Sequence, residues 1–193
     1  MADERQPDLE RLERGLVAIG RSPTDAGRVE LIACRPREGE RRVLEQARLD
    51  VGDGLIGDDW KTRGSRRTTD GNAHPGMQLN VMNSRVIGLL AGDRARWPLA
   101  GDQLYVDLDL STANLPPGTR LAVGSALIEV TAEPHLGCRK FELRFGLDAL
   151  KFVNSRQRRH LNLRGINARV VRSGDVRLGD VVRKLPDLAD ARR

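Results

Sequence analysis

Short apolar runs recur along the chain, and glycine, proline or aspartate separates most of them. Runs of about four to eight residues bounded in this way are typical of β-strands. Many short strands at such spacing are typical of a β-barrel or a β-sandwich. The expected strands are Leu16–Gly20, Val29–Cys34, Arg42–Leu49, Met77–Met82, Leu104–Leu110, Arg120–Thr131, Ile166–Arg172 and Asp180–Leu185. The pattern therefore predicts a mostly β fold with few helices.

Helical signals are confined to two short segments. The first is Ser84–Leu90, where Asn83 or Ser84 would cap the helix because short polar side chains accept hydrogen bonds from its first amides. The second is Leu147–Arg156, in which Leu147, Leu150 and Val153 would share one face. We expect residues 1–14 to form a polar N-terminal tail or helix, residues 15–185 one domain, and residues 186–193 a C-terminal tail.

Composition indicates a soluble globular protein, since 39% of the 193 residues are hydrophobic and 31% are charged. No apolar run approaches the roughly 18 residues that a membrane-spanning helix needs. The first residues contain no apolar core of a secretory signal. These features predict a cytoplasmic protein without a membrane partner.

The chain has two cysteines, Cys34 and Cys138. Two cysteines cannot form a disulfide framework or, by themselves, a cysteine-rich zinc site. Both are expected to be free thiols in a reducing compartment. Cys34 ends an apolar strand-like run, so burial is the better interpretation for it.

Positive charge is concentrated in the second half of the chain. The net charge is +6, and residues 139–184 contain 13 lysines and arginines against four acidic residues. Such a basic region predicts an anionic partner, which could be a nucleic acid, a membrane or a phosphorylated small molecule. Nucleic acid is disfavoured because aromatic residues make up only 3%, and single-strand binders usually stack bases on aromatic rings.

Several short segments stand out by their order and spacing: Gly54–Asp58, Gln78–Met82, Gly101–Leu104, Leu108–Leu110, Leu115–Gly118, Arg120–Thr131, Gly137–Phe141, Gly165–Val171 and Gly174–Asp180. Taken together, they resemble the MOSC domain family, and the resemblance covers roughly residues 15–185. At the acid–asparagine pair of the family this chain has Asp102-Gln103, and at the proline that often precedes the family cysteine it has Gly137.

The resemblance implies a MOSC-type β-barrel and a role with the molybdenum cofactor, a molybdopterin. MOSC domains occur at the C-terminal end of molybdenum cofactor sulfurases and as stand-alone proteins. The large sulfurases also have a pyridoxal-phosphate domain, for which this chain is too short, so pyridoxal phosphate is not expected in it. The family cysteine, here Cys138, is implied to carry sulfur or to ligate molybdenum.

The surroundings of Cys138 support a reactive thiol. Arg139 and Lys140 follow it, and nearby cations favour the thiolate. A thiolate can accept sulfur as a persulfide or bind a soft metal. Gly137 would leave room for a bulky ligand beside the sulfur. His135 is a second catalytic candidate, since an imidazole could stabilise the thiolate or transfer a proton.

Arginine-rich segments could bind the phosphate of the cofactor, because guanidinium groups hold phosphate with two hydrogen bonds. The alternative is a solvated basic surface. The candidates are Arg63, Arg66 and Arg67 in the long loop between residues 57 and 74, Arg139 and Lys140 beside the cysteine, and Arg156, Arg158, Arg159 and Arg164 in a later loop.

Three functions follow from these features. The first is a cofactor-binding protein that carries or transfers sulfur, or ligates molybdenum, through Cys138. The second is a molybdenum-dependent reductase of N-hydroxylated compounds. A sulfur donor or an electron-transfer protein would be the partner in these two cases. The third, from another class, is a basic nucleic-acid-binding β-barrel.

Overall fold

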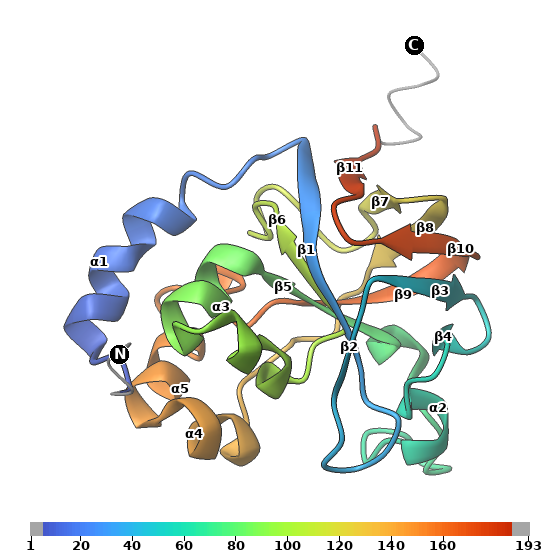
Figure 1. The fold of residues 1–193 in the computed structure, drawn as a ribbon, viewed down its shortest axis with the longest axis horizontal. Helices are drawn as coiled ribbons and strands as arrows, with labels where there is room; N and C mark the ends of the chain where they lie inside the picture. Colours follow the sequence, from blue (N-terminus) through green and yellow to red (C-terminus); the bar gives the residue numbers. More distant parts are fainter. Residues whose placement is uncertain (1–5, 187–193) are drawn as a thin grey trace.

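The computed structural model describes residues 6–186 and shows a closed β-barrel with most of the helices on one side (Figure 1). Seven strands are hydrogen-bonded in the order β11-β7-β8-β9-β5-β6-β1, and pairing of β11 with β1 closes the barrel. These strands are β1 (Ala26–Cys34), β5 (Leu79–Asn83), β6 (Leu104–Asp107), β7 (Arg120–Val123), β8 (Ala126–Val130), β9 (Ile166–Arg172) and β11 (Val181–Lys184). The predicted mostly β barrel is confirmed.

Four further strands lie outside this closed set of seven. β2 (Arg42–Leu44) pairs with the end of β1, while β3 (Gln46–Asp50), β4 (Gly54–Leu55) and β10 (Gly174–Arg177) form a separate sheet. The helices are α1 (Leu9–Ile19), α2 (Trp60–Arg63), α3 (Ser84–Ala91), α4 (Arg139–Phe145) and α5 (Leu147–Val153), with 3-10 helices at Pro75–Met77, Arg94–Ala100 and Arg159–Leu161. Among residues 6–186, no helix has the length and apolar character needed to cross a membrane.

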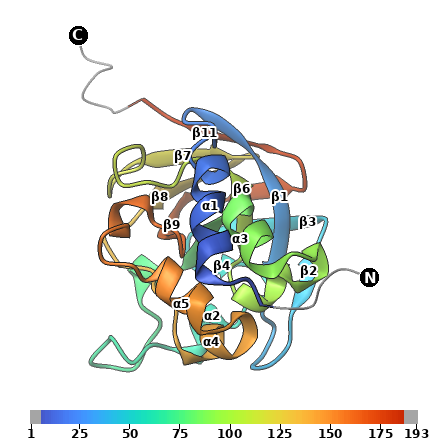
Figure 2. The ribbon, with the colours of Figure 1, turned by 90° about the vertical axis from the view of Figure 1, so that its left-hand side faces the viewer.

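Side chains that alternate between the two faces of the strands form two hydrophobic layers. In β5, Leu79 and Val81 belong to the interior of the barrel, whereas Met82 belongs to a second cluster that includes the helices. In β6, Leu104 is in the first cluster and Tyr105 is in the second. Successive side chains of a strand point to opposite faces, so one strand serves both layers. Figure 2 shows α1, α3 and α5 lying over that outer face.

The predicted strand Leu16–Gly20 is wrong, because its residues form the end of α1 and the cap after it. Asp8 caps this helix by accepting a hydrogen bond from the amide of Arg11. Leu9, Leu12, Leu16 and Ile19 follow helical spacing, and all four contact the second cluster. The apolar run was therefore part of a helical pattern that began earlier in the chain.

Two of the predicted strands are each divided into two in the structure, and the two predicted helices end at slightly different residues. The run Arg120–Thr131 is a hairpin, because Gly124 adopts a φ of 57° between β7 and β8. The run Arg42–Leu49 is two strands in different sheets. The helices predicted at Ser84–Leu90 and Leu147–Arg156 form at Ser84–Ala91 and Leu147–Val153, and the side chain of Asn83 caps the first.

One end of the barrel collects segments that are distant in sequence. The chain leaves β1 and β8 there, and it enters β6 and β9 there. The loop between β1 and β2, together with α2 and α4, lies at this end, at the bottom of Figure 1.

Candidate functional site

A buried ion cluster joins three of these segments. Asp102, before β6, accepts hydrogen bonds from Nη1 of Arg164 at 2.9 and 2.8 Å. Nε2 of His135, after β8, lies 2.8 Å from Oδ1 of Asp102. The Asp102 side chain has no exposed surface, and those of Arg164 and His135 are 6% and 11% exposed. The carboxylate is thus paired on both sides, as a buried charge requires.

Burial and neighbouring charges determine the protonation states of Asp102 and His135. Burial alone would raise the pKa of Asp102, but the charge of Arg164 and the hydrogen bond with His135 outweigh burial and bring the pKa to about 2. The pKa of His135 is lowered by burial and by Arg164, although Asp102 opposes this change. At neutral pH the imidazole is therefore neutral, and its Nε2 is the atom that donates to Asp102.

The segment from Thr131 to Cys138 has no regular secondary structure, and partly buried residues alternate with exposed ones along it. Its inward positions are Thr131, Glu133, His135 and Gly137, and its outward positions are Ala132, Pro134, Leu136 and Cys138. Each inward position is anchored. The hydroxyl of Thr131 donates to the Gly76 carbonyl at 2.6 Å, and the Asn167 amide donates to the Glu133 carbonyl at 3.0 Å. His135 contacts Asp102, as described above.

The last anchor lies directly before Cys138. The side chain of Asn154 accepts from the Gly137 amide at 2.9 Å and donates to the Gly137 carbonyl at 3.0 Å. A Cβ atom on Gly137 would lie 2.8 Å from a methyl group of Leu150 in α5. The expectation that Gly137 leaves room for a ligand is therefore wrong, because α5 occupies that space.

The anchored segment presents Cys138 to solvent. Cys138 is exposed, precedes the first residue of α4, and makes no side-chain capping hydrogen bond. Cys34 is buried, as expected, and burial raises the pKa of its thiol. His135 is partly buried against Asp102, whereas Cys138 is exposed, so the catalytic role of His135 stays a prediction.

A second buried carboxylate ties the long loop to the same end of the barrel. Asp58 accepts from the backbone amide of Arg35 at 2.9 Å and from its guanidinium at 3.2 and 3.1 Å. Arg67 reaches Glu133 of the cysteine segment, with 3.4 Å between Nη1 and Oε2. The long loop and the cysteine segment are therefore neighbours.

The structure distributes the predicted phosphate-binding residues over different surroundings. Arg63 pairs with Asp59 at 2.7 Å, Lys140 with Glu38 at 2.6 Å, and Arg158 with Glu13 of α1 at 2.9 Å. Among residues 6–186, the side chains of Arg66, Arg139, Arg156 and Arg159 make no hydrogen bond or ion pair. Arg164, predicted as a phosphate-binding residue of the later loop, is instead buried as the counter-charge of Asp102.

Sequence reasoning did not select Asp102, Asp58, Arg35, Arg41 or Asn154 as site residues. Asp102 and Asp58 carried a signal, because each stands at a glycine–aspartate pair next to a strand in the segments of the family resemblance. Arg35, Arg41 and Asn154 had no local signal. Within the described part of the chain, no three His, Cys, Asp or Glu side chains gather as metal ligands.

Comparisons with known proteins agree with the barrel fold. The family model of the MOSC domain matches residues 84–183. The YuaD protein of Bacillus subtilis has a similar structure, with a TM-score of 0.61 and 16% identity over 81% of this chain and 94% of YuaD. YiiM of Escherichia coli has a TM-score of 0.53 and 18% identity over 83% of this chain and 71% of YiiM. A search of curated protein sequences found no match.

Proposed function

Because the chain belongs to the MOSC domain family, which is generally associated with the molybdenum cofactor, we propose that it binds this cofactor and that Cys138 is the attachment point. The observation that carries the proposal is the anchored segment from Thr131 to Cys138. Four inward anchors hold an otherwise irregular segment and leave one thiol facing outward. Such preorganisation is what a reactive or metal-binding group requires.

The residues at this end of the barrel suit the chemistry of the cofactor. Cys138 supplies a soft sulfur ligand, which suits molybdenum and sulfur exchange. Two buried donors next to Asp102 have no acceptor among the described residues, namely Nε2 of Gln103 and Nε of Arg164. A surplus of donors favours a ligand rich in acceptors, such as a pterin with a phosphate, because unpaired buried donors are costly.

Each residue has a separate part in this proposal. Cys138 would hold the sulfur or the metal, while His135 and Asn154 keep its segment in place. Arg63, Arg66, Arg67, Arg139 and Lys140 supply positive charge around the cysteine segment for the anionic cofactor, and Arg156, Arg158 and Arg159 extend the basic surface. When bound, the cofactor would supply the redox chemistry of molybdenum.

Two uses of Cys138 fit the exposed thiol. As a sulfur carrier, its thiolate would attack the terminal sulfur of a donor persulfide, giving a Cys138 persulfide and the donor thiolate. As a metal ligand, it would serve a reductase of N-hydroxylated compounds that receives electrons from a partner protein. The exposure of Cys138 suits both, since either partner must approach it.

The experiment is reconstitution of the purified protein with isolated cofactor, followed by elemental analysis and native mass spectrometry. We expect bound molybdenum and pterin in the wild type and in Cys34→Ala, which keeps the exposed cysteine. Cys138→Ser should lose the molybdenum or any added sulfur atom while keeping part of the pterin affinity. Molybdenum retention that is equal in Cys138→Ser and wild type would refute the role of Cys138. Absorbance typical of bound nucleic acid, without pterin, would favour the nucleic-acid alternative.

A further inference from the structure

Arg41 is a half-buried guanidinium without a carboxylate partner among residues 6–186. It ends the loop that joins β1 to β2, and the one side-chain hydrogen bond that it makes within residues 6–186 runs from Nη1 to the carbonyl of Glu40, at 2.5 Å. Its Nε is buried and has no acceptor in this part of the chain. Since an unpaired buried donor is costly, particularly on a charged group, the native protein should compensate this one.

The acidic side chains near Arg41 are already engaged by other cations. The carboxylate of Glu40 pairs with Arg37 and Arg42, at 2.7 Å in each case. Glu38 pairs with Lys140, and Asp59 pairs with Arg63. There are therefore enough acidic residues near Arg41 to neutralise it, but their carboxylates pair with other cations instead.

A second arginine without a carboxylate partner among the described residues, Arg144, lies in α4. Nη1 of Arg144 donates to the carbonyl of Leu99 at 2.7 Å. Nη2 of Arg41 lies 3.8 Å from the point that a Cβ of Gly101 would occupy, so both arginines border the segment that leads to Asp102. Burial, followed by the charges of Arg144 and Arg35, lowers the pKa of Arg41.

Like charges held together in a partly buried place repel one another unless an anion lies between them. We propose that Arg41 and Arg144 form a binding site for a tetrahedral oxyanion. Guanidinium forks suit such an anion because they can donate two hydrogen bonds in parallel. Gly101 leaves the approach to Arg41 free of a side chain.

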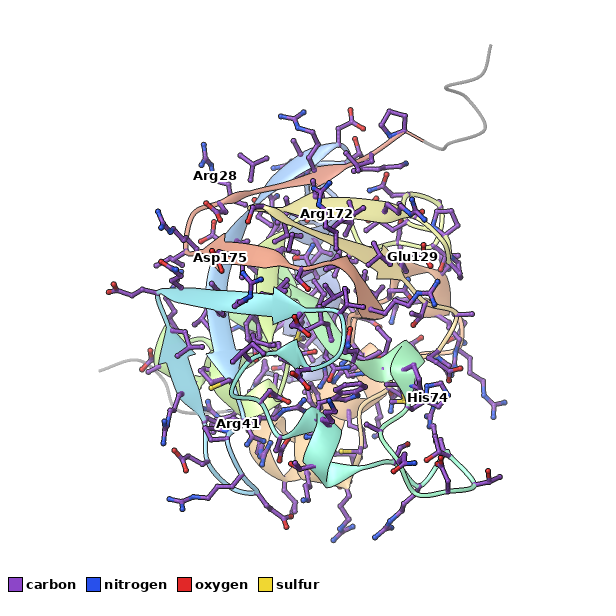
Figure 3. All side chains as sticks on the ribbon, turned by 90° about the vertical axis from the view of Figure 1, so that its right-hand side faces the viewer. Arg28, Arg41, His74, Glu129, Arg172 and Asp175 are labelled. Atoms are coloured by element: carbon purple, nitrogen blue, oxygen red, sulfur yellow. The ribbon has the colours of Figure 1, made fainter. Side chains whose placement is uncertain are left out.

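The location of the site suggests its ligand. Figure 3 shows Arg41 at the same end of the molecule as His74 and α2, far from Arg28 and Arg172 at the other end. This is the end where the cysteine segment lies. This step rests on the proposed function. The natural oxyanion is then the terminal phosphate of the cofactor. Arg41 and Arg144, rather than the more exposed arginines of the long loop, would bind it.

The test measures thermal unfolding and isothermal titration with inorganic phosphate and sulfate, against chloride at equal ionic strength. Arg41→Gln is compared with Arg37→Gln, a matched control in the same loop whose side chain is 82% exposed. We expect phosphate to stabilise the wild type and the control equally. Affinity in Arg41→Gln should fall about tenfold or more, as loss of a charge-assisted hydrogen bond predicts.

A further variant separates the effect of the positive charge of Arg41 from that of its forked guanidinium group. Arg41→Lys retains the charge but loses the fork, so its affinity should lie between those of wild type and Arg41→Gln. In chloride, Arg41→Gln should be at least as stable as the wild type, because repulsion from Arg144 is relieved. Equal loss of affinity in Arg41→Gln and Arg37→Gln would overturn the site, since it would indicate only general electrostatic attraction.

The same variants distinguish this inference from the proposed function. Phosphate binding that depends on Arg41, in a protein that never takes up the cofactor, would support the oxyanion site and refute the cofactor. Cofactor uptake that is unchanged in Arg41→Gln would support the proposed function and overturn the assignment of the phosphate to Arg41.

Discussion

Replacement of Asp102 by asparagine tests the buried cluster most directly. The change keeps the shape of the side chain but removes its charge, which leaves the buried Arg164 guanidinium without its counter-charge and weakens the anchor on His135. Breaking a buried ion pair by removing one partner typically costs about 3–5 kcal/mol. We therefore expect Asp102→Asn to be strongly destabilised at pH 7.

An independent argument from protonation gives a similar size. The pKa of Asp102 falls from 3.8 to about 2 on folding, which corresponds to roughly 2–3 kcal/mol of stability in the ionised form. The sign follows from linkage. Because the pKa is depressed in the folded state, this stability is present above the unfolded pKa and is lost as pH falls from about 4 to about 2.

Urea unfolding measured at several pH values provides the assay. The free energy of unfolding of the wild type should decrease between about pH 4 and pH 2. In Asp102→Asn this decrease should be smaller, because the contribution of the Asp102 carboxylate is missing. Asp53→Asn is the control, since Asp53 forms an exposed pair with Lys61 and should lose no more than about 1 kcal/mol. A loss at pH 7 that is no larger in Asp102→Asn than in Asp53→Asn would refute the reasoning.

The remaining predictions concern the cysteine segment. Native Cys138 should react rapidly with an alkylating reagent while Cys34 reacts only on unfolding, and equal labelling rates by mass spectrometry would contradict the exposures. Gly137→Ala should lose about 1–3 kcal/mol in urea unfolding through its clash with Leu150, and a neutral result would mean that α5 yields. His135→Gln should remove a decrease in stability that the wild type shows as pH falls below about 6.5, because the lowered pKa keeps the folded imidazole neutral while the unfolded one takes up a proton. Parallel pH curves for the two proteins would argue against that protonation state.

The barrel itself was largely predictable from local patterns. The predicted strand Ile166–Arg172 coincides with β9, and the helix at Ser84 begins where Asn83 caps it. These elements depend on alternation, periodicity and capping, which are properties of neighbouring residues. The error at Leu16–Gly20 arose because a five-residue window could not show that the apolar spacing starts at Leu9.

The candidate site, too, was predictable from the sequence only in part. The sequence by itself determined that Cys138 is the cysteine outside an apolar run and that cations follow it. Only the tertiary structure brought together Asp102, His135 and Arg164, which come from three separate segments. It also decided that Arg164 neutralises a buried carboxylate, whereas Arg41 has no carboxylate partner among the described residues. A residue's type specifies its charge and its donors, but its partners and its burial depend on which strands the closed barrel brings to the same end.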